Sequence, residues 1–364
     1  MRHIVLSSAI AALAVGLITG CGSQQPAPQD SPISPETHEA GQDSEPVPLE
    51  DVTVIADNLD APWSIAFAEQ TPVISERDTA RIVELDEAGE AREIAVIEQT
   101  EPAGEGGLLG IAIFQEHLYA YLTTSEDNRV HRYELTGDPG SLQLGDAEVI
   151  LEGIPAAQNH NGGRLAFGPD DMLYITTGDA VEPSQSQDVD SLAGKILRLT
   201  PEGEVPADNP FDNSPVYSYG HRNPQGLDWT DDGTMYASEF GQDTWDELNV
   251  IQPGGNYGWP EVEGIGTNDE YINPVQQWTP AEASPSGIEI SDDALFMVSL
   301  RGERLWEIPL DEPETSTAHF TNEFGRLRDV TTAPDGSLWV LTSNTDGNGE
   351  PSAQDDRILE ITLP

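Results

Sequence analysis

One pattern recurs six times along the chain and limits the folds that it can adopt. Each copy is a short strand of alternating apolar and polar residues, usually an acidic or glycine turn, and a second apolar strand, which together predict a β-hairpin. A third strand-like segment follows each hairpin, such as ARIVELD after the first and DRILEITLP after the last. The copies begin at Ile65, Ile111, Leu165, Leu227, Ile288 and Val330. Their spacing of about 40 to 60 residues predicts an all-β fold, a six-bladed β-propeller.

The two ends of the repeat region predict how the ring closes. The chain ends within the sixth of these third segments, and the segment DVTVIADNL, which starts at Asp51, precedes the first hairpin. In a circular fold the N-terminal strand would lie beside the C-terminal one and complete its sheet. A β-sandwich is the alternative, but it would not explain six copies of one pattern. We therefore expect residues 51–364 to form one propeller domain.

The first 21 residues predict export. Arg2 and His3 precede an apolar run that is too short to span a bilayer comfortably, which is typical of a bacterial signal peptide. The run ends in Ile-Thr-Gly-Cys, which resembles a lipobox, and Cys21 is the only cysteine in the chain. A plain signal peptide cut elsewhere is the alternative. We expect a protein anchored by a lipid on Cys21 to the outer face of the cytoplasmic membrane, at the cell surface or in the periplasm.

Residues 22–50 contain no aromatic residue, no Lys and no Arg, and they are rich in Pro, Ser, Gln and acids. This composition predicts a disordered tether. The whole chain has 66 Asp and Glu against 15 Lys and Arg, for a net charge of −51. Such a polyanion repels nucleic acids and anionic lipids, and a surface adapted to high salt or acid explains most of its carboxylates. Positions where the few cations cluster therefore require a reason.

Four arginines occupy corresponding loop or strand-end positions in different repeats, where propellers bind ligands at one mouth of the channel. Arg222 lies in SYGHRNPQGLDW, Arg301 in VSLRG, and both Arg326 and Arg328 in GRLRD. If they converge, they predict an anionic ligand with several carboxylates or phosphates. Ion pairing with carboxylates of neighbouring blades is the alternative.

Three further loops carry candidate chemistry. His160, in HNGG at the start of a strand, is a candidate general base, although a structural histidine is the alternative. The glycines after it, like those around Glu105 in GEGG, would let a ligand approach the backbone closely. The acidic, glycine-rich segment from Ser238 to Gly264 offers carboxylates and carbonyls that suit Ca²⁺, although its spacing is not that of an EF-hand.

Six motifs in order carry a family resemblance. They are GEGGLLGIAI, HNGGRLAFGPD, SLAGKILRLTPEGEVPADNPF, YGHRNPQGLDW, DELNVIQPGGNYGWPEVEG and RLRDVTTAPDGSLWVLT. Over roughly residues 52–364 the chain resembles the soluble quinoprotein glucose dehydrogenases, and more closely their aldose sugar dehydrogenase or glucose/sorbosone dehydrogenase branch. The resemblance implies a six-bladed propeller that carries pyrroloquinoline quinone (PQQ), a planar tricarboxylate, in its mouth. It also implies oxidation of aldoses at C1 to lactones and an electron acceptor that the sequence does not identify. A homodimer is one candidate oligomeric state, which the sequence leaves open.

The resemblance implies roles for individual residues. His160 would be the general base, and Arg222, with calcium, would stabilise negative charge on the quinone oxygen. The residues implied in cofactor binding are Glu105, Asn159, His160, Arg222, Asn223, Arg301, Arg326 and Arg328. The implied calcium ligands are the carbonyls of Gly241 and Gln242, for an ion that bridges to PQQ, and Glu247 and Tyr257, for a second, structural ion.

Two positions depart from the glucose enzymes. Arg301 stands where they have a lysine, which keeps the charge but changes its reach. Asn159 stands where they have an aspartate, which removes a carboxylate that could orient the histidine. Together with short loops after the second and fourth blades, this favours broad aldose specificity. Two other functions stay open: a calcium-dependent lactonase propeller, and a non-catalytic propeller that binds a sugar or a protein and has lost PQQ.

Overall fold

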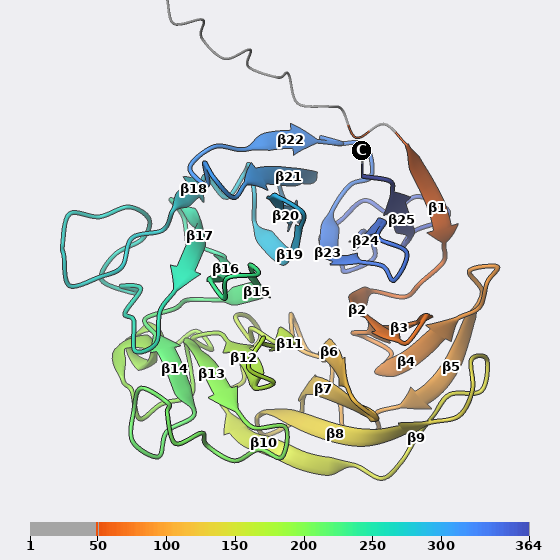
Figure 1. Ribbon diagram of the computed structural model, residues 1–364, viewed down its shortest axis with the longest axis horizontal. Helices are drawn as coiled ribbons and strands as arrows, with labels where there is room; N and C mark the ends of the chain where they lie inside the picture. The colour runs from red at the N-terminus through yellow and green to blue at the C-terminus, as the bar shows by residue number, and fades with distance from the viewer. Residues whose placement is uncertain (1–48, 50, 364) are drawn as a thin grey trace, which may run out of the picture. The chain divides into compact units, whose positions relative to one another are not determined.

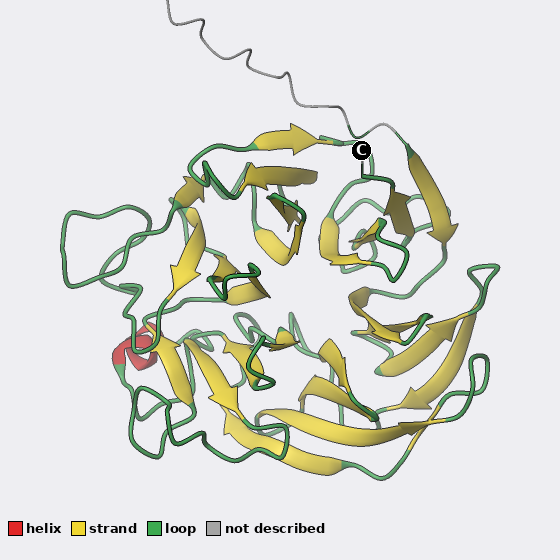
Figure 2. Cartoon of the chain, in the orientation of Figure 1, coloured by secondary structure: helices red, strands yellow, loops and turns green. Residues whose placement is uncertain are grey.

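The structure is a computed structural model that describes Leu49 and residues 51–363. The predicted signal peptide, Cys21 and nearly all of the predicted tether lie outside the described residues. No helix within the described part of the chain is long and apolar enough to cross a membrane. In this part the chain forms strands and loops, and its one helical segment is the 3₁₀ turn η1 (Pro183–Gln187) (Figure 2).

Six small antiparallel sheets surround a central axis, as Figure 1 shows, and their strands are named from the innermost outward. Blade 1 contains β2 (Pro62–Ala68), β3 (Thr71–Glu76), β4 (Arg81–Leu85) and β5 (Ala91–Val96). Blade 2 contains β6 (Leu108–Phe114), β7 (His117–Thr123), β8 (Asn128–Thr136) and β10 (Glu148–Ile154), with β9 (Gln143–Leu144) beside β8. Blade 3 contains β11 (Leu165–Phe167), β12 (Leu173–Thr177), β13 (Lys195–Leu199) and β14 (Val216–Tyr219).

The remaining blades repeat this arrangement. Blade 4 contains β15 (Pro224–Trp229), β16 (Met235–Glu239), β17 (Asp246–Ile251) and β18 (Gln276–Trp278). Blade 5 contains β19 (Pro285–Ser291), β20 (Ala294–Ser299), β21 (Arg304–Pro309) and β22 (Thr317–His319). Blade 6 contains β23 (Leu327–Thr332), β24 (Leu338–Thr342), β25 (Ile358–Ile361) and β1 (Val52–Ala56). The predicted six-bladed propeller is confirmed.

The ring closes as the sequence predicts. Strand β1 pairs antiparallel with β25, with Val52 opposite Ile361, so the two ends of the repeat region share one sheet. Each predicted hairpin forms the two inner strands of a blade, and each following segment forms the third strand. The outermost strands of blades 1 to 5 were not predicted. They are short or half-exposed, as in the three-residue strand β22, and so lack a clear alternating pattern.

The core lies between neighbouring blades, where apolar faces of adjacent sheets meet. One buried cluster joins Val73 and Ile82 of blade 1 to Leu118 of blade 2. The inner strands also leave backbone N–H groups free at their edges, and carboxylates from the preceding blade accept hydrogen bonds from them. Glu289 accepts one from Thr332, at 2.9 Å, and Asp329 accepts one from Ile65 across the closure of the ring, also at 2.9 Å.

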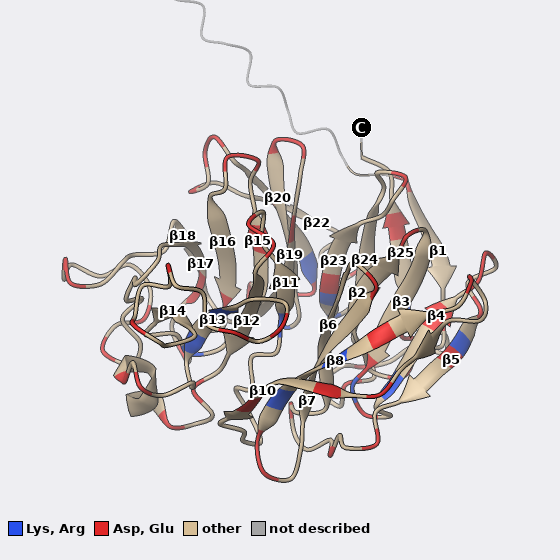
Figure 3. Ribbon diagram, turned by 60° about the horizontal axis from the view of Figure 1, so that its bottom comes forward, with Lys and Arg blue, Asp and Glu red and all other residues tan. Residues whose placement is uncertain are grey.

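Two kinds of loop lie at one end of the blades. One leads from an outer strand into the next inner strand, and the other joins the second and third strands of a blade. The hairpin turns lie at the opposite end, together with the start of β1 and the end of β25. Figure 3 shows Asp and Glu on many loops, whereas Lys and Arg are few. The end that carries the first two kinds of loop, called the mouth below, holds most of the predicted site residues.

Candidate functional site

His160 lies in the loop that leads into β11, and its backbone is in the left-handed region, with a φ of 61°. The glycines that follow it fit tightly against the protein itself. A Cβ on Gly162 would lie 2.6 Å from the carbonyl oxygen of Thr176, and one on Gly163 would lie 2.6 Å from a methyl carbon of Leu109. The two glycines therefore let this loop pack against β12 and blade 2. Close approach of a ligand, which the sequence suggested, is not needed to explain them.

His160 is oriented by a buried carboxylate. Its Nδ1 lies 2.7 Å from Oδ1 of Asp179, a residue that follows β12 and is 0 % exposed. Oδ2 of Asp179 accepts a hydrogen bond from Nε1 of Trp259 at 2.8 Å, and its Oδ1 also accepts one from the backbone of Val181. With Nδ1–H directed to a carboxylate, the Nε2 atom of His160 carries the lone pair, as a general base requires.

Asp179 stays ionised despite its burial. Burial alone would raise the pKa of this carboxyl group, but hydrogen bonding and the charge of His160 outweigh that effect, with help from Trp259 and Val181. The result is a pKa below the usual value for aspartate. A negative charge is therefore held 2.7 Å from the imidazole, where it can stabilise a protonated ring.

Asn159 and Glu105 flank the histidine differently. Asn159 is exposed and makes no hydrogen bond to His160 in the described structure, so the orienting carboxylate comes from Asp179 instead. Glu105 lies in the loop that leads into β6, and its Oε2 accepts a hydrogen bond from the backbone N–H of His160 at 2.9 Å. The contact between Glu105 and His160 was not predicted from the sequence, which also missed Asp179 and Trp259.

Arg222 lies in the loop before β15 and is largely buried. Its backbone N–H donates to Glu239, its guanidinium lies 5.5 Å from the ring centre of Trp259, and an Nη1–H donates to the carbonyl of Phe240 at 3.3 Å. Burial lowers the pKa of Arg222. Its buried Nε has no hydrogen-bond partner among the described residues. A buried donor without a partner is unfavourable, and an acceptor on a ligand would satisfy it.

Asn223, the next residue, holds the histidine loop in place. Its side chain is buried, and its Oδ1 accepts a hydrogen bond from the backbone of Gly162 at 2.9 Å. Its own carbonyl accepts a hydrogen bond from Phe240. The Arg222–Asn223 pair predicted from the sequence thus connects blade 4 to the loop that carries His160.

Arg326 and Arg328, two further arginines predicted from the sequence, both lie beside the carboxylate of Asp346 but contact it differently. Arg326 donates to Oδ2 of Asp346 at 2.8 Å and 3.2 Å, an ion pair within blade 6. Arg328 is 6 % exposed; its Nη1 donates to Gln225 at 2.9 Å, and its Nη2 lies 3.6 Å from the same Asp346 oxygen. Burial, with Arg326 nearby, lowers the pKa of Arg328 to about 10, and its Nε has no partner among the described residues.

Arg301 behaves unlike the other three arginines. Its side chain is exposed and makes no ion pair or hydrogen bond within the described residues. Internal pairing, the alternative considered from the sequence, therefore applies to Arg326, whereas Arg222 and Arg328 retain donors that the protein does not satisfy.

The predicted calcium loop folds around a glutamate. The backbone N–H groups of Gln242, Asp243, Thr244 and Trp245 all donate to Oε1 of Glu263, at 2.6 to 3.2 Å. These hydrogen bonds lower the pKa of Glu263, although burial opposes them. Gly241 donates to Asp246 at 2.9 Å. The N–H groups of this loop are thus used internally, whereas the carbonyls of Gly241 and Gln242 accept no hydrogen bond from the described residues.

Glu247 and Tyr257 line a small cavity with Glu239 and Glu263. Burial, and then the charge of Glu239, raise the pKa of Glu247. The hydroxyl of Tyr257 already donates to Val250 and accepts from Gln252, both at 2.8 Å, so it is satisfied without a metal ion. Within the described residues, no three His, Cys, Asp or Glu side chains form a group that could hold a metal ion on their own. A cation here would need carbonyl or cofactor oxygens as well.

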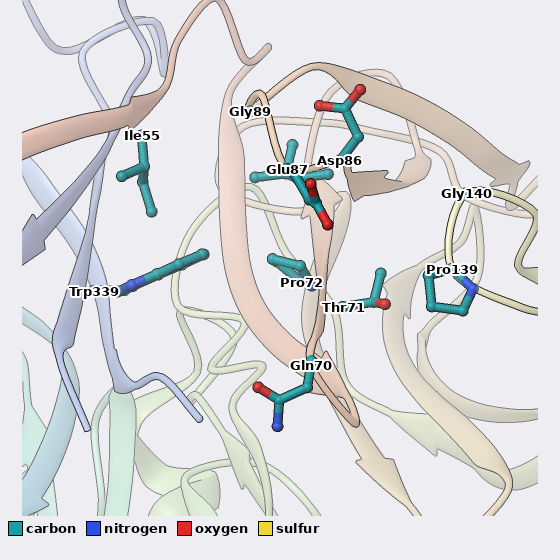
Figure 4. A pocket seen from close by; sticks show the side chains of 11 residues that line it. Ile55, Gln70, Thr71, Pro72, Asp86, Glu87, Gly89, Pro139, Gly140 and Trp339 are labelled. Carbon is teal, nitrogen blue, oxygen red and sulfur yellow. The ribbon is translucent and has the colours of Figure 1, made fainter. Parts of the chain in front are cut away.

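A different hollow, of about 550 Å³, lies at the end of the blades opposite the mouth (Figure 4). Trp339, Ile55 and Pro72 form much of its wall, and Asp86 and Glu87 are its only charged residues. It has no histidine or arginine in its lining, so it offers neither a base nor an anion-binding group. The chemistry predicted from the sequence belongs to the mouth.

The family profile named Glucose / Sorbosone dehydrogenase matches residues 59–351. The chain belongs to this family. It is similar to the PQQ-bound aldose sugar dehydrogenase of Streptomyces coelicolor, with 48% identity and a TM-score of 0.82 over 86% of this chain and 98% of that one. The aldose sugar dehydrogenase of Escherichia coli is 30% identical over 81% of this chain and 91% of its own length.

Other matches include a quinoprotein dehydrogenase and a lactonase. The quinoprotein glucose dehydrogenase B of Acinetobacter calcoaceticus is 32% identical over 61% of this chain and 54% of its own length. A gluconolactonase of Xanthomonas campestris shares 13% identity at a TM-score of 0.50, which shows a common fold alone. The predicted resemblance to the glucose/sorbosone dehydrogenase branch is confirmed.

Proposed function

We propose that this chain is an aldose dehydrogenase that uses PQQ and calcium and oxidises sugars at C1 to lactones. The observation that carries the proposal is the His160–Asp179 pair, with Nδ1 and Oδ1 2.7 Å apart, at the same end of the propeller as Arg222 and Arg328. A general base and unsatisfied buried cations suit proton removal beside an anionic cofactor.

The residues present fit a planar tricarboxylate. The Nε atoms of Arg222 and Arg328 are buried and have no partner among the described residues, so oxygens of an anionic ligand would satisfy both. Arg326 and Arg328 would hold carboxylates, while Asn223, Glu105 and Asn159 would lie around the ring. Arg301, which is exposed, would contribute its charge from the rim. When bound, PQQ supplies the electron acceptor that takes the hydride from C1.

The side chains of this protein would act on the sugar and on the charges. His160 would take the proton of the anomeric hydroxyl on its Nε2 as C1 loses hydride, which leaves a carbonyl at C1 and hence a lactone. Asp179 would stabilise the imidazolium that forms. Arg222 would place its positive charge where negative charge grows in the transition state, and its burial strengthens that effect.

Calcium would be held by carbonyls and by buried carboxylates. Ca²⁺ prefers oxygen ligands, and the carbonyl oxygens of Gly241 and Gln242 are available for this role. A second ion would use Glu247 and an oxygen of Tyr257, beside Glu239. Burial and then repulsion from Glu239 raise the pKa of Glu247, and a divalent cation would relieve that repulsion.

The proposal is tested by reconstitution. The purified protein is mixed with PQQ and Ca²⁺, and its absorbance spectrum is recorded before and after an aldose is added. We expect the spectrum of the cofactor to change to its reduced form on addition of the aldose. A lactonase would hydrolyse lactones without PQQ, and a non-catalytic binder would leave the spectrum of any added PQQ unchanged by sugar; either result would reject the dehydrogenase.

The two buried arginines should have separable effects. Arg328→Ala should weaken PQQ binding by roughly 10- to 150-fold, the effect of losing one charge-assisted contact. Arg222→Ala should lower kcat even at saturating PQQ, because its charge acts in the transition state. A PQQ titration followed by kinetics at saturating cofactor distinguishes the two.

Arg132→Ala provides a matched control, since Arg132 pairs with Glu148 on the outer strands of blade 2. Full recovery of kcat by the Arg222 variant at high PQQ would limit Arg222 to cofactor binding. Unchanged PQQ affinity in both variants would make these arginines structural.

We further propose that the protein is exported and attached to the membrane through Cys21, which lies outside the described residues. Cys21→Ser should move the protein from the membrane fraction to the soluble fraction without changing its specific activity. The measurement is activity in each fraction of cells that produce the two forms. Activity that remained with the membranes in the variant would contradict the lipid anchor.

A further inference from the structure

Side chains of opposite blades meet on the axis of the propeller, where the inner strands begin. The group consists of Trp63 from blade 1, Arg164 from the start of blade 3, Gln225 from blade 4, and Arg328 and Asp329 from blade 6; it is called the axial cluster below. All five are buried. Blades 3 and 6 face each other in a ring of six, so a contact between Arg164 and Asp329 must cross the axis.

Arg164 is held by contacts to three other blades. Its Nη1 lies 2.8 Å from Oδ1 of Asp329, and its Nε donates to the backbone carbonyl of Gln225 at 2.8 Å. Its Nη1 also donates to Ser64 at 3.2 Å, and its guanidinium lies 4.5 Å from the ring centre of Trp63, whereas its Nη2 has no partner among the described residues. Arg164 is 7 % exposed, so this ion pair is shielded from solvent and from salt.

Arg328 contacts the same two neutral partners. Its guanidinium lies 5.7 Å from the ring centre of Trp63, and its Nη1 donates to the side-chain oxygen of Gln225 at 2.9 Å. Gln225 therefore accepts a hydrogen bond from Arg164 on its backbone carbonyl and one from Arg328 on its side-chain oxygen. The axial cluster thus links the two guanidinium groups through one indole and one glutamine.

The charges of the axial cluster and of the neighbouring Arg326 and Asp346 are divided unequally. Arg164 and Asp329 form a close pair, and Arg326 and Asp346 form another at the mouth. Arg328 is left with an oxygen of Asp346 at 3.6 Å that Arg326 already holds at 2.8 Å. Three arginines share two carboxylates, so one buried positive charge, on Arg328, lacks a carboxylate of its own. Burial, and then the positive charges of Arg326 and Arg77, lower the pKa of Arg328.

We propose that Arg164 is a positioning residue: by taking Asp329 as its ion-pair partner across the axis, it keeps Arg328 free to bind a carboxylate group of the cofactor. This inference rests on the proposed use of PQQ. Asp329 follows Arg328 directly in β23, and without Arg164 it would be a buried carboxylate with no cation. Such a charge is costly unless it is paired, and Arg328 is the one other cation of the axial cluster.

Removal of Arg164 should therefore act at a distance on the cofactor. In Arg164→Gln, Asp329 competes with PQQ for Arg328, and PQQ affinity should fall about tenfold or more. Asp329→Asn keeps an oxygen for the N–H of Ile65 but removes the competing charge, so its PQQ affinity should equal or exceed that of the wild type. The double variant Arg164→Gln/Asp329→Asn should recover affinity close to the wild type, because neither charge of the pair remains.

The measurement is a fluorescence titration of each apo-protein with PQQ in the presence of Ca²⁺, at a temperature well below the melting point of every variant. The matched control is Arg198→Gln, because Arg198 is also 7 % exposed and forms ion pairs with Asp170 and Asp208, but near the outer strands of blade 3. We expect this control to lower the melting temperature and to leave PQQ affinity unchanged.

Each other outcome overturns the inference in a different way. Normal PQQ affinity in Arg164→Gln would show that the pair has no influence on Arg328. Weakened binding that the double variant does not restore would mean that Arg164 contacts the cofactor or supports the fold in general. If the wild type itself fails to bind PQQ, the proposed function fails first, and that result is read from the wild-type titration alone.

Discussion

His160→Ala should lower kcat by roughly 10² to 10⁴-fold while PQQ stays bound, because it removes a positioned general base and leaves the arginines in place. The backbone N–H of residue 160, which donates to Glu105, survives the substitution. The measurement is steady-state kinetics at saturating PQQ, with cofactor content determined from absorbance.

The chain offers a matched control for this experiment. His319 also pairs with a carboxylate, since its Nε2 lies 2.7 Å from Glu307, but it lies on the outermost strand of blade 5. His319→Ala should leave kcat unchanged. A His160 variant within a factor of a few of the wild type would place the base on another residue.

Asp179→Asn should lower kcat by about 10²-fold or more, although the side chain keeps its size. The carboxylate accepts three hydrogen bonds, from His160, Val181 and Trp259, and an asparagine has only one oxygen for them. In either orientation its NH₂ group would face a donor, either Trp259 or the N–H of Val181. The substitution also removes the charge that would stabilise a protonated His160.

The double variant Asp179→Asn/Trp259→Phe separates these two effects. Phenylalanine removes the indole N–H, so the asparagine can direct its oxygen to His160 and Val181 without a conflict. The conflict between the asparagine NH₂ group and a donor should destabilise the Asp179→Asn variant, and we expect the double variant to recover part of that stability. It should recover little of the lost kcat, because the negative charge is still absent. Recovery of full kcat would show that Asp179 acts through geometry alone.

The fold was predictable because its signal repeats. Six alternating hairpins, each with a third strand, determine the blades, and the segment from Asp51 indicates how the ring closes. The outer strands gave little signal, since strands such as β18 and β22 have three residues and only one buried side chain between them. They form because the third strand of each blade presents a free edge, which is a property of the assembled sheet.

The site was predictable where a single loop determines it. His160, Glu105 and Arg222 lie in loops that each lead into an inner strand, so repeat position alone brings them to one end. Asp179 was missed because an aspartate after a strand is typical of a turn, and its role depends on a histidine from another loop.

The Arg164–Asp329 pair was missed for a related reason. It joins residues from opposite blades that lie far apart in the sequence, a contact that no local pattern encodes. Arg164 directly follows the HNGG motif, and in the sequence alone it has the appearance of an ordinary strand-starting residue. Only the closed ring shows that these two side chains meet.

The start of β1 and the end of β25 lie at the end of the blades opposite the mouth. Immobilisation of the protein on a solid support through either chain terminus of the propeller should therefore leave the loops that carry His160 and Arg222 open to substrate.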